Sequence, residues 1–279
     1  MSPILSIVTE TGLRDHGTSR GDDAPAIVLL HGLMGRGRTW GRQIPWLRRY
    51  GRVFTFDAAF HTGALSPDGT PWDIDEIAAD EIATERFVAD VAECLTWIDR
   101  GPAVLIGHSM GGLHAWCTAA QYPELVAALV VEDMAPDFRG QTTQDWTPWF
   151  ASWPDRFQSP AQAAAMFGEV AGRYFYEAFD DGRLHGDLSI WAAIAEEWGG
   201  RDFWAQWQAC DGTPTLLLEA QHTVTPPGQM QRMAQMHSRA AYLRVSDAGH
   251  LVHDDAPDTY RGAVEAFLSR TDLTSAPAR

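Results

Sequence analysis

Short apolar runs alternate along the chain with longer segments whose apolar positions recur at helical spacing. The short runs lie at 24–32, 51–57, 102–107, 125–133, 213–220 and 240–250. The run at 24–32 is rich in Val, Leu and Ile, as expected of a strand buried on both faces. Helical segments are predicted at 39–50, 80–100, 114–122 and 258–270. This alternation predicts an α/β fold, with a mainly parallel sheet and helices on both of its faces.

The alternation stops between Pro136 and Trp207. Seven of the chain's twelve tryptophans lie in this stretch, and its helical pieces are broken by Gly and Pro. We therefore predict a core made of residues 1–135 and 208–270, interrupted by an aromatic-rich helical insertion at 136–207. Residues 271–279 are expected to form a disordered tail.

Composition narrows the classes of partner. The chain has 279 residues and a net charge of −16, which disfavours nucleic acid and anionic lipid surfaces. All 21 basic residues are arginine, so lysine-based Schiff-base chemistry and lysine-dependent phosphate loops are excluded. Three separate cysteines indicate a reducing compartment. The start of the chain lacks the pattern of a secretory signal, and no apolar run is long enough to span a membrane, so a cytoplasmic location is expected.

One short motif points to chemistry. In AVLIGHSMGG, residues 103–112, Ser109 stands between a strand-like run and a predicted helix. Gly107 and Gly111 complete a G-x-S-x-G pattern, in which a sharp turn exposes the serine hydroxyl at the edge of the sheet. The strand before the motif and the helix after it make this match specific. Ser109 is the candidate nucleophile.

A serine hydroxyl needs a base, and His250 is the best placed of ten histidines. It follows the last predicted strand, where a loop can bring it over Ser109. His253 lies three residues further on and is expected to pack or to form hydrogen bonds. Two backbone N–H groups should stabilise the oxyanion: that of Met110, and that of Leu33 in HGLMG, with Met34 as the alternative to Leu33.

These motifs resemble those of the α/β-hydrolase superfamily over nearly the whole chain. The resemblance lies in HGLMG, in GHSMGG, in the aromatic insertion and in DAGHLVHDDAP. It implies an eight-stranded, mainly parallel sheet with a helical cap at 136–207. Similarity to the esterase and acyl-thioesterase branch implies a Ser-His-acid mechanism that uses neither metal nor cofactor.

The acid departs from the pattern of most relatives. Thr223 stands where they have an aspartate after the seventh strand. Some relatives hold the acid at the end of the sixth strand, where this chain offers Glu132 and Asp133. Neighbouring strand residues point to opposite faces, so only one of the two can approach His250. Asp133 is favoured because a similar D-x-A-P ending occurs in small bacterial esterases, and Glu132 stays the alternative.

The predicted reaction is hydrolysis of a carboxylic ester with an apolar or aromatic moiety, through an acyl-enzyme. Its binding site is expected to include Met34, Trp40, Trp146, Trp149 and Phe150. The expected partner is a small apolar ester; nucleic acid and a membrane span are not expected, and a homodimer is left open.

Other functions stay open at this point. Thioesters and lactones would use the same groups. Hydrolysis of a carbon–carbon bond in a ring-cleavage product would need an arginine for the substrate carboxylate, for which Arg36, Arg38 and Arg139 are candidates. A ligand-binding protein on a hydrolase scaffold, with little turnover, is the alternative from a different class.

Overall fold

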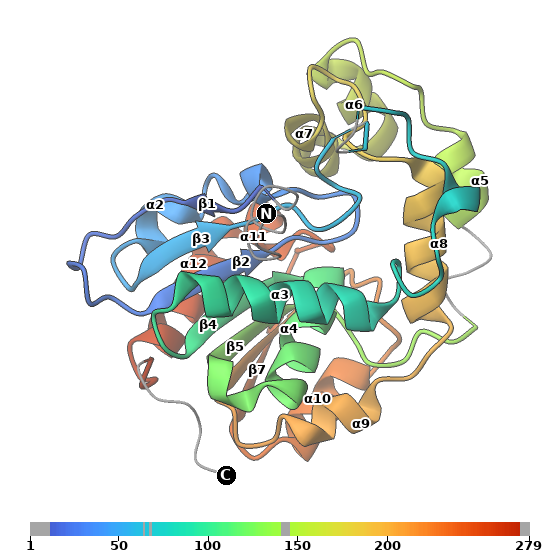
Figure 1. The fold of residues 1–279 in the computed structure, drawn as a ribbon. Helices are drawn as coiled ribbons and strands as arrows, with labels where there is room; N and C mark the ends of the chain where they lie inside the picture. Colours follow the sequence, from blue (N-terminus) through green and yellow to red (C-terminus); the bar gives the residue numbers. More distant parts are fainter. Residues whose placement is uncertain (1–11, 64, 67–68, 141–145, 274–279) are drawn as a thin grey trace.

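The computed structural model describes residues 12–63, 65–66, 69–140 and 146–273, whose centre is a mainly parallel sheet (Figure 1). Within these described residues the strand order is β1-β3-β2-β4-β5-β6-β7, and only β1 is antiparallel to its neighbour. The strands are β1 Arg14–Asp15, β2 Ala26–Leu30, β3 Arg52–Thr55, β4 Ala103–His108, β5 Val126–Glu132, β6 Thr215–Ala220 and β7 Ala240–Val245. All six predicted strands are therefore present.

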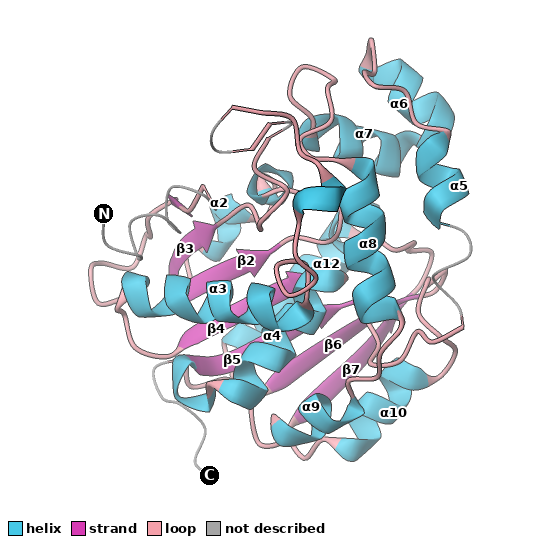
Figure 2. Cartoon of the chain, turned by 45° about the vertical axis from the view of Figure 1, so that its right-hand side comes forward, coloured by secondary structure: helices cyan, strands magenta, loops and turns pink. Residues whose placement is uncertain are grey.

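Helices cover both faces of this sheet, as Figure 2 shows. On one face lie α3 Thr84–Ile98 and α4 Met110–Gln121, and on the other α2 Ile44–Leu47 and α12 Pro257–Leu268. Strand β2 shows why: Val28 and Leu30 pack into the first core, and Ile27 and Leu29 into the second. Burial on both faces accounts for the continuous apolar run of this strand.

The remaining helices lie after β5 or near the C-terminus. They are α5 Trp146–Ala151, α6 Pro160–Phe167, α7 Glu169–Ala178, α8 Leu188–Gly199, α9 Trp204–Ala209, α10 Gln229–Met236 and α11 Val252–Asp255. Short 3₁₀ turns occur earlier in the chain, at Gly37–Trp40, Ile74–Glu76 and Pro123–Leu125. Helices α5 to α8 stand beyond one end of the sheet, whereas α9 lies beside α10 (Figure 1). Trp207 of α9 donates to the Met233 carbonyl at 3.1 Å, so the end of the predicted insertion packs on the core.

Two expectations need correction. The described residues contain seven strands, not eight. The helix predicted at 39–50 is instead a 3₁₀ turn followed by the four-residue α2, since Pro45 can begin a helix but cannot continue one. Of the predicted disordered tail, Leu273 is described and buried; residues 274–279 lie outside the described part.

Candidate active site

Ser109 occupies the turn between β4 and α4 in a conformation rare for a residue with a side chain. Its φ is 52° and its ψ is −125°, and such backbone strain persists only where the surroundings enforce it. A Cβ on Gly107 would lie 2.3 Å from the Gly111 carbonyl oxygen, and one on Gly111 would lie 2.3 Å from that of Leu30. Both glycines of the motif are therefore required by close backbone approach. The turn leaves Ser109 half-buried.

His250 and Asp133 form a hydrogen-bonded pair beside this turn. Nδ1 of His250 lies 2.7 Å from Oδ2 of Asp133, and Oδ1 of Asp133 accepts from the Ala220 amide at 2.9 Å. Asp133 is fully buried and takes a left-handed φ of 46° just after β5. An ionised carboxylate only accepts hydrogen bonds, so the proton of neutral His250 resides on Nδ1 and leaves Nε2 as a base.

Ser109, His108 and His250 line one cavity, which is described below. His108 lies next to the serine, and its Nε2 is 3.0 Å from the His250 carbonyl oxygen. No hydrogen bond joins Ser109 Oγ to the His250 ring among the described residues. Such contacts often become short only when substrate is bound.

Glu132 has a different partner. Its Oε1 accepts from the His253 amide at 3.1 Å and lies 2.7 Å from His253 Nδ1. Burial lowers the pKa of His253, but the Glu132 carboxylate, together with Asp254 and Asp255, more than offsets this, so the pKa is raised. Glu132, the last residue of β5, and Asp133, which follows it with a left-handed φ, thus contact different histidines, and Asp133 is the one that reaches His250.

The loop 31–35 passes directly over Ser109. A Cβ on Gly32 would lie 2.7 Å from His108 Nδ1 and 3.1 Å from the Ser109 Cβ. The loop is held by His31, whose Nε2 accepts from the Ala58 amide at 2.9 Å. The backbone amides of Leu33 and Met110 have no acceptor among the described residues. They are therefore available to an oxyanion.

A cavity of about 650 Å³ opens above Ser109. It reaches from the 31–35 loop to α5, α6, α7 and α8, and it is lined mainly by apolar side chains: Leu33, Met34, Met134, Phe138, Trp149, Met166, Phe167, Ala171, Tyr174, Phe175, Trp198, Val224 and Leu251, together with His108, Ser109 and His250. Its size and lining are typical of sites for small apolar molecules.

Only some of the residues expected to line the substrate-binding site do so. Met34 and Trp149 line the cavity. Trp40 does not: it is buried in the core on the opposite face of the sheet, stacked on His253 at 4.7 Å between ring centroids. Phe150 is buried against Trp149 and Trp153 instead of facing the cavity. The Trp146 side chain lies outside the described residues.

Sequence reasoning missed much of the wall that α6, α7 and α8 provide. Ala171, Tyr174 and Phe175 face the cavity from one side of α7. Their spacing of three and four residues is a signal that the sequence contains. Spacing alone predicts only that these residues share a side, and not whether that side meets a cavity or a packed core.

The arginines proposed to hold a substrate carboxylate are already paired. Arg36 forms ion pairs with Asp57 at 3.2 Å and Asp180 at 2.8 Å, and Arg38 binds Asp180 at 2.6 Å. Arg139 pairs with Asp137 at 2.7 Å and Asp202 at 3.1 Å. None of the three lines the cavity above Ser109.

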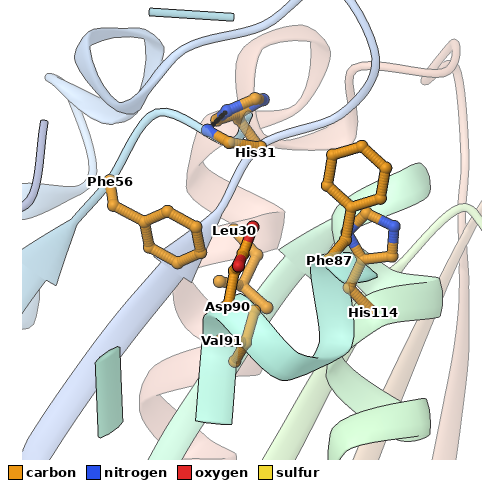
Figure 3. A pocket seen from close by; sticks show the side chains of 8 residues that line it. Leu30, His31, Phe56, Phe87, Asp90, Val91 and His114 are labelled. Carbon is orange, nitrogen blue, oxygen red and sulfur yellow. Dashed lines mark hydrogen bonds between the residues drawn. The ribbon is translucent and has the colours of Figure 1, made fainter. Parts of the chain in front are cut away.

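A second, much smaller cavity lies between the 31–35 loop and helices α3 and α4 (Figure 3). It measures about 10 Å³ and is surrounded by Leu30, His31, Phe56, Ala58, Phe87, Asp90, Val91 and His114. This is room for about one water molecule and not for a substrate. The cavity of about 650 Å³ is the candidate active site, because Ser109 and His250 line it.

Several histidines of the described residues are wholly buried and kept neutral. Burial lowers the pKa of His31, His61, His108, His114 and His185, to about 3 for His114. Below pH 6.5 the unfolded chain binds protons that these folded histidines do not. Their contribution to stability is therefore complete above pH 6.5 and is lost as the pH falls toward the folded pKa values.

We accordingly expect the protein to unfold in mild acid. At pH 4.5, His114 alone would destabilise the fold by about 3 kcal/mol relative to pH 7. Thermal melts from pH 7.5 to 4 should show a steep fall in Tm, and His114→Gln should lose less stability than wild type over this range. His222→Gln, which alters an exposed histidine, is the matched control. Equal pH dependence in all three proteins would contradict the assignment of neutral buried histidines.

Among the described residues no helix combines the length and apolar character that crossing a bilayer requires. All three cysteines are buried and outside disulfides. Burial raises the pKa of Cys117 and Cys210, the latter to about 12. Both thiols are thereby disfavoured as nucleophiles at neutral pH.

A serine turn above a parallel sheet, with histidine and a buried carboxylate on loops at the same end, defines a protein of the α/β-hydrolase type. A family model described as the alpha/beta hydrolase family matches residues 27–263. The chain therefore belongs to this family.

Similar proteins include enzymes with different named activities. The chain is 28% identical over 271 residues to the sn-1-specific diacylglycerol lipase ABHD11 of Mus musculus, covering 88% of this chain and 81% of that protein. It is 27% identical to the putative non-heme bromoperoxidase BpoC of Mycobacterium tuberculosis, covering 91% and 96%. A hydrolase from Oleispira antarctica superposes with a TM-score of 0.74 at 16% identity, covering 96% and 98%. These relatives support a hydrolase and do not select one substrate.

Proposed function

We propose that this protein is a serine hydrolase that cleaves a carboxylic ester with an apolar or aromatic moiety through an acyl-enzyme. The observation that carries the proposal is the 2.7 Å contact between His250 and the buried Asp133, beside Ser109 at the base of an apolar cavity. The lipase activity named for the mouse relative agrees with this chemistry.

In the first half of the reaction, Ser109 Oγ bonds to the ester carbonyl carbon while His250 Nε2 takes the hydroxyl proton. The carbonyl π electrons move to oxygen, and the amides of Leu33 and Met110 stabilise the negative charge. Asp133 stabilises the protonated ring. When the tetrahedral intermediate collapses, the carbon–oxygen bond to the alcohol breaks and His250 returns its proton to the leaving alkoxide.

In the second half, water replaces the alcohol. His250 takes a proton from this water as the water oxygen bonds to the acyl carbon. When this second tetrahedral intermediate collapses, the bond between the acyl carbon and Ser109 Oγ breaks, a carboxylic acid is released, and His250 returns its proton to Oγ. Thioesters and lactones would react with the same groups.

We also propose that α5–α8 act as a cap that supplies the apolar wall of the cavity. We further propose that the protein is cytoplasmic.

Carbon–carbon bond hydrolysis of a carboxylate-bearing substrate has less support. The cavity is lined by no cationic arginine among the described residues, and Arg36, Arg38 and Arg139 are all ion-paired elsewhere. A substrate carboxylate would lose its hydration without gaining a partner, which costs several kcal/mol. The geometry therefore favours an uncharged substrate.

A matched pair of esters tests this proposal. We expect kcat/KM for p-nitrophenyl esters to rise from acetate to medium chain lengths as the acyl chain fills the apolar cavity. The hemisuccinate, which places a carboxylate in the cavity, should react at least about 10²-fold more slowly than the butyrate. Initial rates of p-nitrophenol release measure both. A hemisuccinate that reacts as fast as the butyrate would favour the carboxylate-bearing class, and hydrolysis of no ester would contradict the proposal.

A further inference from the structure

A second carboxylate–histidine pair lies behind the candidate triad. Glu132 and His253 are 0% and 1% exposed, and the carboxylate receives both the His253 amide and its Nδ1–H. Nδ1 is also 2.9 Å from the second carboxylate oxygen. Because a buried carboxylate is costly unless it is paired and hydrogen-bonded, these contacts tie His253 firmly to strand β5.

The pair sits next to the residues that perform the proposed chemistry. Glu132 immediately precedes Asp133, and in the register of the sheet it is the partner of His108, which precedes Ser109. The Ser109 amide donates to the Glu132 carbonyl at 2.8 Å. The side chains of both partners bind the segment that contains His250: His108 at the His250 carbonyl, and Glu132 at His253.

That segment has little intrinsic stability. Helix α11 has four residues, and so short a helix does not form without tertiary contacts. His253 lies in this helix, packed on one side against the Trp40 ring at 4.7 Å and close to Tyr260 at 5.9 Å. Its position is thus set by the ring packing and by Glu132.

We propose that Glu132 and His253 are positioning residues, which hold α11 on the end of strand β5 and so keep the His250 ring between Asp133 and Ser109. This inference rests on the proposed function. His253 does not line the cavity, so it acts through the backbone that it shares with His250 and not on the substrate. A displacement of about 1 Å in a reacting group can cost about 10²-fold in rate.

Substitutions of His253 test the proposal. His253→Ala removes the ring and the side-chain hydrogen bond, and we expect kcat to fall by about 10- to 10²-fold with KM changed less than about threefold. His253→Gln retains an N–H donor for Glu132. The fall in log kcat should therefore be at least about a third smaller in His253→Gln than in His253→Ala. The exposed His222→Ala is the control. Steady-state kinetics on a p-nitrophenyl ester give kcat and KM separately.

The outcomes separate failure of this inference from failure of the proposed function. An active wild type with unchanged kcat in His253→Ala, or equal kcat in the alanine and glutamine variants, would overturn the positioning role. An inactive wild type would instead overturn the proposed function. If His253→Ala does not fold, the nearly isosteric Glu132→Gln replaces it; its amide oxygen still accepts from His253, so kcat should fall by less than about tenfold. A double-mutant cycle of Glu132→Gln with His253→Gln should show coupling, and strictly additive effects would contradict the pair.

Discussion

Substitution of Ser109 by alanine is expected to lower kcat for an ester substrate by about 10⁶-fold. The variant keeps the cavity and the backbone N–H groups of Leu33 and Met110, but it lacks the oxygen that would bond to the acyl carbon. Residual turnover would then come only from substrate binding and oxyanion stabilisation. The half-buried position of Ser109 at the base of the cavity, with φ of 52°, is the structural reason for this expectation.

The measurement combines kinetics with covalent labelling. A fluorophosphonate probe should label the wild type on Ser109, as shown by mass spectrometry of the modified peptide, and should leave Ser109→Ala unlabelled. Ser269→Ala, which alters an exposed serine of the C-terminal region, serves as the control and should be labelled like the wild type. A folded wild type that is neither labelled nor active would favour a ligand-binding protein on a hydrolase scaffold.

The second large effect is expected at Asp133. Asp133→Asn should lower kcat by about 10⁴-fold, because an amide at this position can donate to Nδ1 and so stabilise the wrong tautomer of His250. It also removes the charge that stabilises the protonated ring. Since Oδ1 of Asp133 also accepts from the Ala220 amide, the loop geometry should be retained, and the measured Tm will show whether it is.

Glu132→Gln provides the matched comparison at the neighbouring residue. Its expected loss is below about tenfold, since Glu132 contacts His253 and not His250. Both variants should be assayed with the same ester across pH 6–9. A loss of about 10⁴-fold in Glu132→Gln, with little loss in Asp133→Asn, would transfer the role of triad acid to Glu132.

Much of the fold follows from local patterns. The six predicted strands are all present, because runs such as 26–30 are buried on both faces and carry mostly branched aliphatic residues. The turn at Ser109 could also be predicted from the sequence, because its glycines are required by backbone contacts with residues only a few positions away or on the adjacent strand. The number of strands could not be predicted from local patterns. The eighth strand was implied only by the resemblance to the α/β-hydrolase superfamily, and the described residues contain seven strands.

The α/β fold, the serine at the strand–helix turn and the two adjacent carboxylates at the end of one strand could all be predicted from the amino-acid sequence. Each of these depends on residue type and on short-range spacing. Three-dimensional packing was needed to show that Asp133 contacts His250 while Glu132 contacts His253. It was also needed to show that Trp149 faces the cavity while Trp40 lies in the core on the other face of the sheet. These outcomes depend on how segments more than a hundred residues apart approach one another, and alternation along a strand states only that two neighbours point apart, without stating what each one meets.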